Sequence, residues 1–244
     1  MCGFVVSLGD IDQEQVKNAT NEIRYRGPDD TNYFLDTEKK IFVGHNRLSI
    51  MDPEYGKQPL VSEDKKIILA YNGEMYNQFE LRKELENNNK KFKSKSSDTE
   101  VVLKGYNFWG DKLFEKIDGQ FAIVIIDLNK DILLISRDKF GEKPVFYYVD
   151  NNKIIIGSEL KIFKHFKNVN LTANPISLKK YFIYSFIPAP QTIYKNIYKV
   201  KHSENIKINL ENFSINKRIY FKPAIIKNNQ FNESKFIDEL DFLI

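Results

Sequence analysis

The sequence predicts an α+β protein in which helices are grouped around two runs of β-strands. Strand-like and helix-like segments do not alternate along the chain, as they would in a βα barrel or a Rossmann sheet. The run 122–126 is continuously apolar, which is typical of a strand buried on both faces. The chain has 244 residues, of which 42% are hydrophobic and 29% charged, so it can bury a sizeable core.

The first elements are expected to be a strand and a helix. Residues 3–8 form an apolar run that predicts a buried strand. Asp12 followed by Gln15 resembles a capping box, in which each side chain bonds the backbone of the other residue. Apolar residues then recur at helical spacing and predict a helix over 13–25, which ends where Gly27 and a proline oppose its continuation.

Three more strands are expected before the next helix, at 32–36, 41–45 and 66–71. The tripeptide Asn72-Gly73-Glu74 predicts a sharp turn after the last of them. Apolar residues around 81–85 then predict a helix, and the polar run 87–97 predicts a surface loop. Asp98 is a suitable N-cap for the helix that follows it.

The second half of the chain is expected to begin as a β-meander. Its strands are separated by turns rich in Asp, Asn and Gly, and are expected at 121–127, 132–137, 145–149 and 153–156. Helices are expected over 159–166 and 176–182. The tail predicts a hairpin over 205–221 and an amphipathic helix over 233–244.

Composition and charge argue against several classes of protein. Lys and Arg number 37 and Asp and Glu 33, a net charge of +4 without a basic stripe, so no nucleic-acid partner is expected. The longest purely apolar run, 121–126, is far too short for a membrane span. No signal peptide is visible and the single cysteine excludes a disulfide framework, so a cytoplasmic protein is expected. One cysteine and three histidines make a zinc site improbable.

The candidate nucleophile is Cys2. Removal of Met1, which a small second residue permits, would leave a thiol and a free α-amine on one residue. The reference pKa of an α-amine is about 7.7–8.0, so this amine can serve as a base near neutral pH. A thiol with a base in reach is an activated nucleophile. The alternative is that a lone cysteine is a small buried hydrophobic residue.

Three other polar features are weaker signals when taken singly. The carboxamide of Asn72 and the backbone N–H of Gly73 can form a two-donor oxyanion hole, although Asn-Gly is also a common turn dipeptide. Arg47 can clamp a carboxylate through paired hydrogen bonds, or it can simply tether a loop. Asp98 can accept from a substrate ammonium, or it can cap a helix.

A resemblance joins these signals. The segments that carry it occur in one order along the chain and are Met1-Cys2-Gly3, Arg26-Gly27-Pro28-Asp29, 45–50, Gln58-Pro59-Leu60, 71–77, 97–100, 118–122, 137–144 and 157–161. Together they resemble the class II (N-terminal nucleophile) glutamine amidotransferase domain of glutamine-hydrolysing asparagine synthetases over residues 1–205. The segment 187–194 resembles the stretch that leads into the synthetase half.

The resemblance implies a fold and a reaction. The fold would be the four-layer α-β-β-α sandwich of N-terminal nucleophile hydrolases. Cys2 would attack the side-chain amide of L-glutamine, with its own α-amine relaying the proton, and a thioester would release ammonia and then glutamate. Asn72 and Gly73 would hold the oxyanion.

The resemblance also implies how glutamine is held. Arg47 would bind its α-carboxylate and Asp98 its α-ammonium. The remaining wall of the pocket would be formed by Leu48, Ser49, Ile50, Met51 and Glu74. The segment 26–29 would fix the loop beside the nucleophile, and His45 has no role as a base in this pattern. The chain departs from the usual pattern at Gln120, where Met is common, and at Glu142, where an apolar residue is common.

The synthetase half of such enzymes is not visible in the sequence. No Ser-Gly-Gly-type pyrophosphate loop is present, although 236–242 resembles the first helix of the synthetase domain. The expected division is a glutamine amidotransferase domain over 1–205, followed by a terminal hairpin, linker and truncated synthetase start over 206–244. No cofactor is expected in this chain, because ATP and magnesium would belong to the missing half.

The partners implied are L-glutamine and a synthetase domain that accepts the ammonia, with a homodimer as one possible assembly. Two alternatives to this function remain. One is another class II amidotransferase, of the glucosamine-phosphate or amidophosphoribosyl type. The other is a catalytically silent interaction or regulatory module that keeps the fold without turnover.

Overall fold

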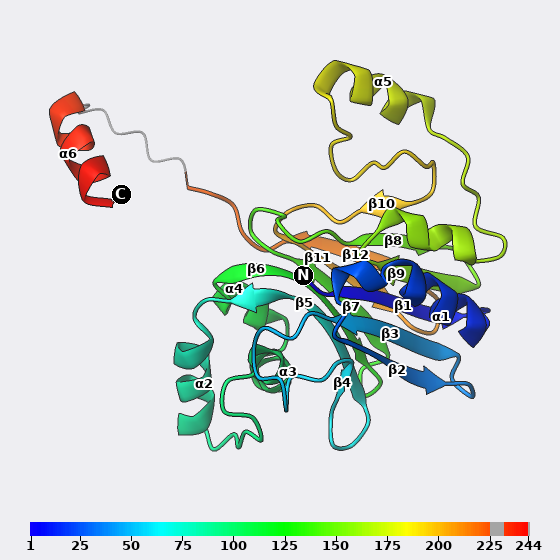
Figure 1. Ribbon diagram of the computed structural model, residues 1–244, viewed down its shortest axis with the longest axis horizontal. Coiled ribbons are helices and arrows are strands. Elements are labelled where there is room, and N and C mark those ends of the chain that lie inside the picture. The colour runs from blue at the N-terminus through cyan, green and yellow to red at the C-terminus, as the bar shows by residue number, and fades with distance from the viewer. Residues whose placement is uncertain (225–231, 244) are drawn as a thin grey trace.

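The computed structural model contains two stacked β-sheets with helices on their outer faces (Figure 1). It describes residues 1–224 and 232–243. Every strand pair in both sheets is antiparallel. The predicted α+β class is therefore confirmed.

The first sheet has β1, which follows Cys2, near its centre. Its strands, in spatial order, are β10 (Tyr198–Lys199), β8 (Phe146–Val149), β9 (Lys153–Gly157), β1 (Gly3–Gly9), β3 (Ile41–Arg47) and β2 (Asp30–Asp36). Strand β1 pairs with β3 on one side and with β9 on the other.

The second sheet carries the segment predicted to hold the oxyanion donors. Its strands, in spatial order, are β12 (Ile215–Ile219), β11 (Glu204–Asn209), β7 (Ile132–Arg137), β6 (Gly119–Asp127), β5 (Ile67–Met75) and β4 (Leu60–Val61). The two-residue strands β4 and β10 were not expected from the sequence.

Alternation along the strands builds a core between the two sheets. In β1, Phe4 and Val6 point toward the second sheet, while Val5 points to the opposite face. In β6, Val124 and Ile126 point back toward the first sheet. All five side chains are at most 1% exposed. Both faces of each sheet are thus apolar, as the continuous apolar runs predicted.

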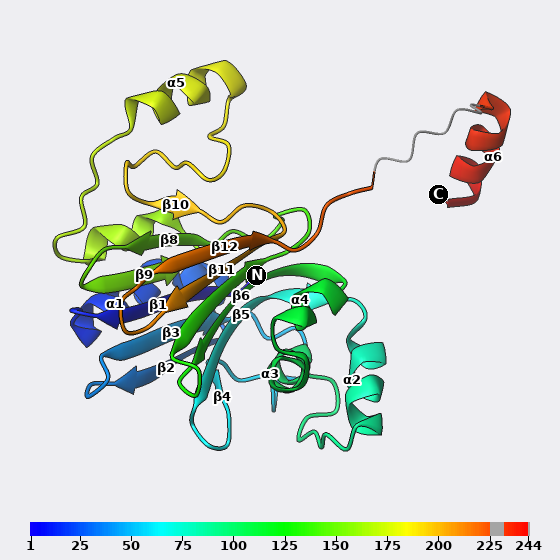
Figure 2. The ribbon, with the colours of Figure 1, turned by 180° about the vertical axis from the view of Figure 1, so that it is seen from behind.

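Helices cover the two outer faces. The first sheet is covered by α1 (Gln13–Glu22) and by the 3₁₀ helix Leu160–His165. The second is covered by α2 (Gln78–Asn87), α3 (Asp98–Trp109) and α4 (Leu113–Lys116). Figure 2 shows the same layers from behind. The four-layer α-β-β-α sandwich is confirmed.

The start of α1 was predicted correctly and its end was not. Asp12 caps the helix, and Asp12 and Gln15 form the expected capping box. The helix ends at Glu22 instead of residue 25, and a 3₁₀ turn follows over Arg24–Arg26. Gly27 then lies so close to β3 that a Cβ would come within 2.4 Å of the carbonyl oxygen of Asn46. The chain can make this close approach only with glycine.

Two local predictions were wrong. Asn72-Gly73-Glu74 is not a turn, because β5 continues to Met75 and these residues pair with β6. The expected meander is also divided: β6 and β7 lie in the second sheet, whereas β8 and β9 lie in the first. The segment 138–145 crosses between the sheets, which local turn composition does not reveal.

The C-terminal elements lie outside the four layers in part. The helix α5 (Pro175–Tyr184) stands away from the sheets in both views (Figures 1 and 2). The hairpin of β11 and β12 was predicted and continues the second sheet through β7. The expected terminal helix is α6 (Glu233–Leu243), while residues 225–231 and 244 lie outside the described part. A division at residue 205 stays a prediction.

Candidate active site

The thiol of Cys2 lies where the first strand begins. The backbone N–H of Leu48 donates to its Sγ at 3.4 Å, and the thiol lies 3.9 Å from the carbonyl oxygen of Leu48. Arg26 donates from Nε to the carbonyl oxygen of Cys2 at 3.0 Å and forms a 2.6 Å ion pair with Glu159. The nucleophile is therefore held by segments far apart in the sequence.

Burial raises the pKa of the Cys2 thiol. The hydrogen bond from Leu48, the neighbouring terminal amine and Arg47 oppose this effect without cancelling it. Burial also lowers the pKa of the terminal amine, which Met1 carries in this structure. The thiol thus rests in its protonated form and needs a base, while the amine near it is biased toward its neutral form.

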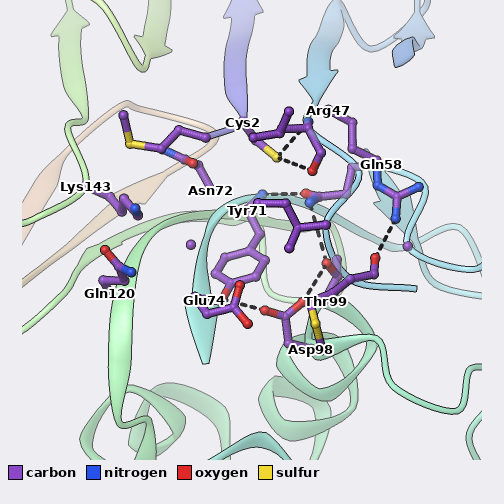
Figure 3. Close-up of a pocket in the computed structure, with 16 residues that line it drawn as sticks. Cys2, Arg47, Gln58, Tyr71, Asn72, Glu74, Asp98, Thr99, Gln120 and Lys143 are labelled. Carbon is purple, nitrogen blue, oxygen red and sulfur yellow. Dashed lines mark hydrogen bonds between the residues drawn. The ribbon is translucent and has the colours of Figure 1, made fainter. Parts of the chain in front are cut away.

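A pocket of about 160 Å³ opens beside Cys2 (Figure 3). This is smaller than the roughly 300–1,000 Å³ of pockets that hold drug-sized ligands. Of the predicted site residues, the pocket is lined by Cys2, Arg47, Leu48, Ile50, Met51, Asn72, Gly73, Glu74 and Asp98. Residues dispersed over the first hundred positions are thus brought together around one small cavity.

Ser49 is the predicted site residue that does not line the pocket. Its backbone N–H instead donates to Asp29 Oδ2 at 2.8 Å. The loop that follows β3 is therefore tied to the segment 26–29, which also holds Cys2 through Arg26. This contact is consistent with the fixing role that the sequence suggested for 26–29.

Asn72 and Gly73 lie on β5 in the wall of the pocket. Asn72 is 1% exposed, and its Nδ2 has no hydrogen-bond partner among the described residues. A buried amide donor without a partner is costly, so it marks a place where a ligand acceptor is expected. Gly73 cannot be replaced without movement, because a Cβ would lie 2.4 Å from the carbonyl oxygen of Gln120.

Arg47 lines the pocket and also shapes its rim. Its guanidinium donates to the carbonyl oxygens of Met51, Asp52 and Pro53 at 2.7–3.0 Å. A Cβ on Gly56 would come within 2.2 Å of Arg47 Nη2, so the loop packs tightly around the charge. Arg47 therefore combines the loop-tethering role and a place in the pocket, which the sequence had presented as alternatives.

Asp98 faces the pocket from the first turn of α3. Ser97, not Asp98, occupies the N-cap position, so the predicted cap was misplaced by one residue. The carboxylate accepts from the Tyr71 hydroxyl at 2.9 Å. Burial raises the pKa of Asp98, and the hydrogen bonds from Tyr71, Thr99 and Met75 act in the opposite direction. Burial and the charge of Asp98 also raise the pKa of Glu74.

His45 lies outside the pocket lining and is fully buried. Burial lowers its pKa to about 4, so the ring is neutral at physiological pH. The ring Nε2 is 3.0 Å from the carbonyl oxygen of Tyr71 and donates to it. This position supports the interpretation that His45 is structural and is not the base for Cys2.

Some residues in the pocket had no role in the sequence analysis. They are Met1, Gly56, Gln58, Tyr71, Thr99, Gln120 and Lys143. Gln58 accepts from the backbone N–H of Tyr71 at 2.7 Å, and its Nε2 lies 3.5 Å from Thr99 Oγ1. Most of these residues lie inside the motifs of the resemblance, which was the signal available for finding them.

Two absences were searched for. Within residues 1–224 and 232–243, no three His, Cys, Asp or Glu side chains are grouped as a metal site would require. Over the same ranges, no helix has both the length and the apolar character needed to cross a membrane.

A cysteine at the start of a central strand in an α-β-β-α sandwich defines an N-terminal nucleophile hydrolase fold. Solved structures with this fold include the glutamine phosphoribosylpyrophosphate amidotransferase of B. subtilis, complexed with ADP and GMP. It matches with a TM-score of 0.64 and 18% identity, over 91% of this chain and 50% of that chain. A glutamine aminotransferase class-II domain protein from Silicibacter pomeroyi matches with a TM-score of 0.50 and 12% identity, over 92% and 100% of the two chains.

Sequence comparison identifies the family. The glutamine amidotransferase domain model matches residues 1–221, so the chain belongs to the glutamine amidotransferase family. It is 35% identical to a putative glutamine-hydrolysing asparagine synthetase 2 of Methanocaldococcus jannaschii, over 96% of this chain and 50% of that protein. It is also 35% identical to asparagine synthetase 1 of Bacillus subtilis, over 98% and 38%. The chain thus spans half or less of the length of these curated relatives.

Proposed function

We propose that this domain hydrolyses L-glutamine to glutamate and ammonia at Cys2. The observation that carries the proposal is the pairing of the chain's only cysteine with an unpartnered buried amide donor, Asn72 Nδ2, at one small pocket. A nucleophile and an oxyanion donor at one cavity are the parts that amide hydrolysis requires.

The reaction would begin on a chain from which Met1 has been removed. The α-amine of Cys2 takes the thiol proton while sulfur attacks the side-chain amide carbon of glutamine. Asn72 Nδ2 and the N–H of Gly73 stabilise the resulting oxyanion. The amine returns its proton to the leaving nitrogen, so ammonia departs and a γ-glutamyl thioester remains. Water, activated by the same amine, then releases glutamate and restores the thiol.

Glutamine is a zwitterion, so its binding calls for one anionic and one cationic anchor. Asp98 is proposed to accept the α-ammonium, and Arg47 to meet the α-carboxylate with its remaining N–H groups. Glu74, Leu48, Ile50 and Met51 complete the wall. Ser49 contributes by fixing the loop through Asp29.

The ammonia is proposed to serve ATP-dependent asparagine synthesis. The relatives of this chain are glutamine-hydrolysing asparagine synthetases that are at least twice as long as the matched region. A synthetase domain would accept the ammonia, use aspartate, and hold the ATP and magnesium. A reducing cytoplasm would suit a reaction that needs a free thiol.

Two other functions are less well supported. A likeness in fold to a phosphoribosylpyrophosphate amidotransferase, at 18% identity, does not favour that acceptor. A catalytically silent module would not need Asn72 Nδ2 to remain buried without a partner.

The decisive experiment combines turnover with covalent labelling. Protein that begins at Cys2 should release glutamate from glutamine, and a glutamine-mimicking electrophile should add once per chain. Intact mass should first show that Met1 is absent, and Cys2→Ala serves as the control for both readouts. Folded, processed protein that neither releases glutamate nor takes up the label would contradict the proposal and favour a silent module.

Tyr71→Phe is expected to make glutamine binding fail at a higher pH. The Tyr71 hydroxyl lowers the pKa of Asp98 by donating to its carboxylate. Without it the pKa of Asp98 rises further, so the carboxylate that would bind the α-ammonium is protonated at a higher pH. The KM for glutamine, measured from pH 8 downward, should therefore begin to rise sooner than in the wild type.

Tyr106→Phe is a matched control for this prediction. Tyr106 donates to Asp127 at 2.8 Å in a similar buried pair, but neither residue lines the pocket. Its loss should lower stability by about 1 kcal/mol, as for a typical hydrogen bond, without changing the pH dependence of KM. Equal pH profiles for Tyr71→Phe and the wild type would remove Asp98 from the binding site.

A further inference from the structure

Lys143 is a nearly buried lysine in the wall of the pocket. It is 9% exposed and lines the pocket with Met1, Asn72 and Gln120. Its ammonium makes no hydrogen bond or ion pair with any residue that the structure describes. A buried charge without a partner is unfavourable for stability, so its position calls for a functional explanation.

The segment 138–144 is built to hold Lys143 in this place. Asp138 is fully buried, and its carboxylate accepts the backbone N–H groups of Phe121, Phe140, Glu142 and Lys143 at 2.9–3.1 Å. Arg137 donates to the carbonyl oxygens of Gly141, Val200 and Lys143, the last at 2.7 Å. The backbone of Lys143 is thus fixed on both sides of its Cα.

Lys143 lies on the side of the pocket opposite the proposed α-carboxylate anchor. In Figure 3, Lys143 and Gln120 are at one end of the pocket and Arg47 and Gln58 are at the other. Lys143 is therefore close to the N-terminus of the chain and distant from the end where the α-carboxylate of glutamine would bind.

We propose that Lys143 acts as a positioning charge for the base, keeping the amino group beside Cys2 neutral and able to accept the thiol proton. The proposal rests on the proposed function and deepens it. A cation close to an amine disfavours a second positive charge, so the neutral amine becomes the preferred form.

The charged groups around the terminal amine are consistent with this role. Burial is the largest cause that lowers its pKa; Lys143 and Arg26 lower it further, while Cys2 and Asp29 raise it. Arg26 is already paired with Glu159, whereas the charge of Lys143 has no partner to offset it. Across the pocket, Lys143 also lowers the pKa of Glu74 against the opposing effect of Asp98. With Met1 removed, the amine would belong to Cys2 in the same pocket.

The test uses chains that begin at Cys2 and carry Lys143→Met, Lys143→Arg or Lys139→Met. Because Cys2 is the only cysteine, protein labelled with ¹³C-cysteine gives one Cα signal whose titration reports the amine. Removing the charge raises the pKa of the amine. In Lys143→Met the amine titration and the acid limb of kcat/KM should therefore move up by about one pH unit, with KM unchanged. Below both limbs, that shift lowers the rate by about tenfold.

The other variants separate charge from structure. Lys143→Arg should keep the wild-type titration because it keeps the charge. Lys139→Met is the matched control, since Lys139 lies on the same segment, pairs with Asp118 at 3.5 Å and does not line the pocket. Lys143→Met should melt at the wild-type temperature or above it, because it removes an unpaired buried charge. If Lys143→Met does not fold, Lys143→Gln supplies the same measurement.

Two results would overturn the proposal. An unshifted amine titration in Lys143→Met would show that the charge does not act on the amine. A raised KM with an unshifted acid limb would instead make Lys143 an anchor for glutamine. The NMR titration needs no turnover. Failure of the wild type to release glutamate would therefore refute the proposed hydrolysis while the effect of Lys143 on the amine is still measured.

Discussion

Glutamine turnover is expected to fall by about 10²–10³ when Asn72 is replaced by Ala, the loss seen when one oxyanion donor is removed from other enzymes. Asn72 Nδ2 has no hydrogen-bond partner in the described structure, so its proposed partner is the oxyanion of the transition state. A group that acts only in the transition state changes kcat and leaves substrate binding nearly unchanged. Steady-state glutamate release across a range of glutamine concentrations separates the two effects.

The stability of Asn72→Ala distinguishes an oxyanion donor from a structural asparagine. Since Nδ2 donates to nothing, its removal leaves no acceptor unsatisfied, and the melting temperature should stay close to that of the wild type. Asn87→Ala, at an exposed position on α2, is the control for a change of the same chemical kind. Wild-type kcat in a folded Asn72→Ala protein would exclude the oxyanion assignment.

Protein that keeps Met1, or that carries an N-terminal extension, is expected to lose about 10²–10⁴ in turnover, the range attributed to a general base. The base proposed here is the α-amine of Cys2, which an amide bond to Met1 abolishes. Met1 also occupies part of the pocket wall, where its sulfur lies 3.9 Å from Arg26 Nη2. Glutamate release by the two forms, each checked by intact mass, gives the comparison.

The same extension placed at the C-terminus is the control, and it should leave turnover unchanged. Trimming the N-terminal extension back to Cys2 should restore activity in the same preparation. Equal turnover with Met1 present and absent would mean that a group other than the α-amine accepts the thiol proton.

Local sequence patterns were sufficient for most of the elements. The capping box at Asp12 and Gln15 gave the start of α1, and the apolar run 122–126 gave a strand buried on both faces. These features depend on residues that are close together in the chain. The layered arrangement followed from the grouping of strands and from the family resemblance.

What was mispredicted depended on contacts between distant segments. Asn72-Gly73-Glu74 has the composition of a turn, yet pairing with β6 keeps it in a strand. The place of Tyr71 and Lys143 at the pocket follows from that pairing and from the path of 138–144 between the sheets. No local pattern encodes either. The roles proposed for the site residues came from the resemblance and from the chemistry of amide hydrolysis.

The position of β1 has a consequence for the motions of the chain. Chain ends usually fray, because they lack partners on at least one side. Here the strand that follows Cys2 is hydrogen-bonded to β3 on one edge and β9 on the other, and its residues 4–6 are at most 1% exposed. Amide exchange in β1 should therefore require opening of the whole sandwich. The beginning of the chain is thus among its most rigid parts, so local breathing does not displace the thiol.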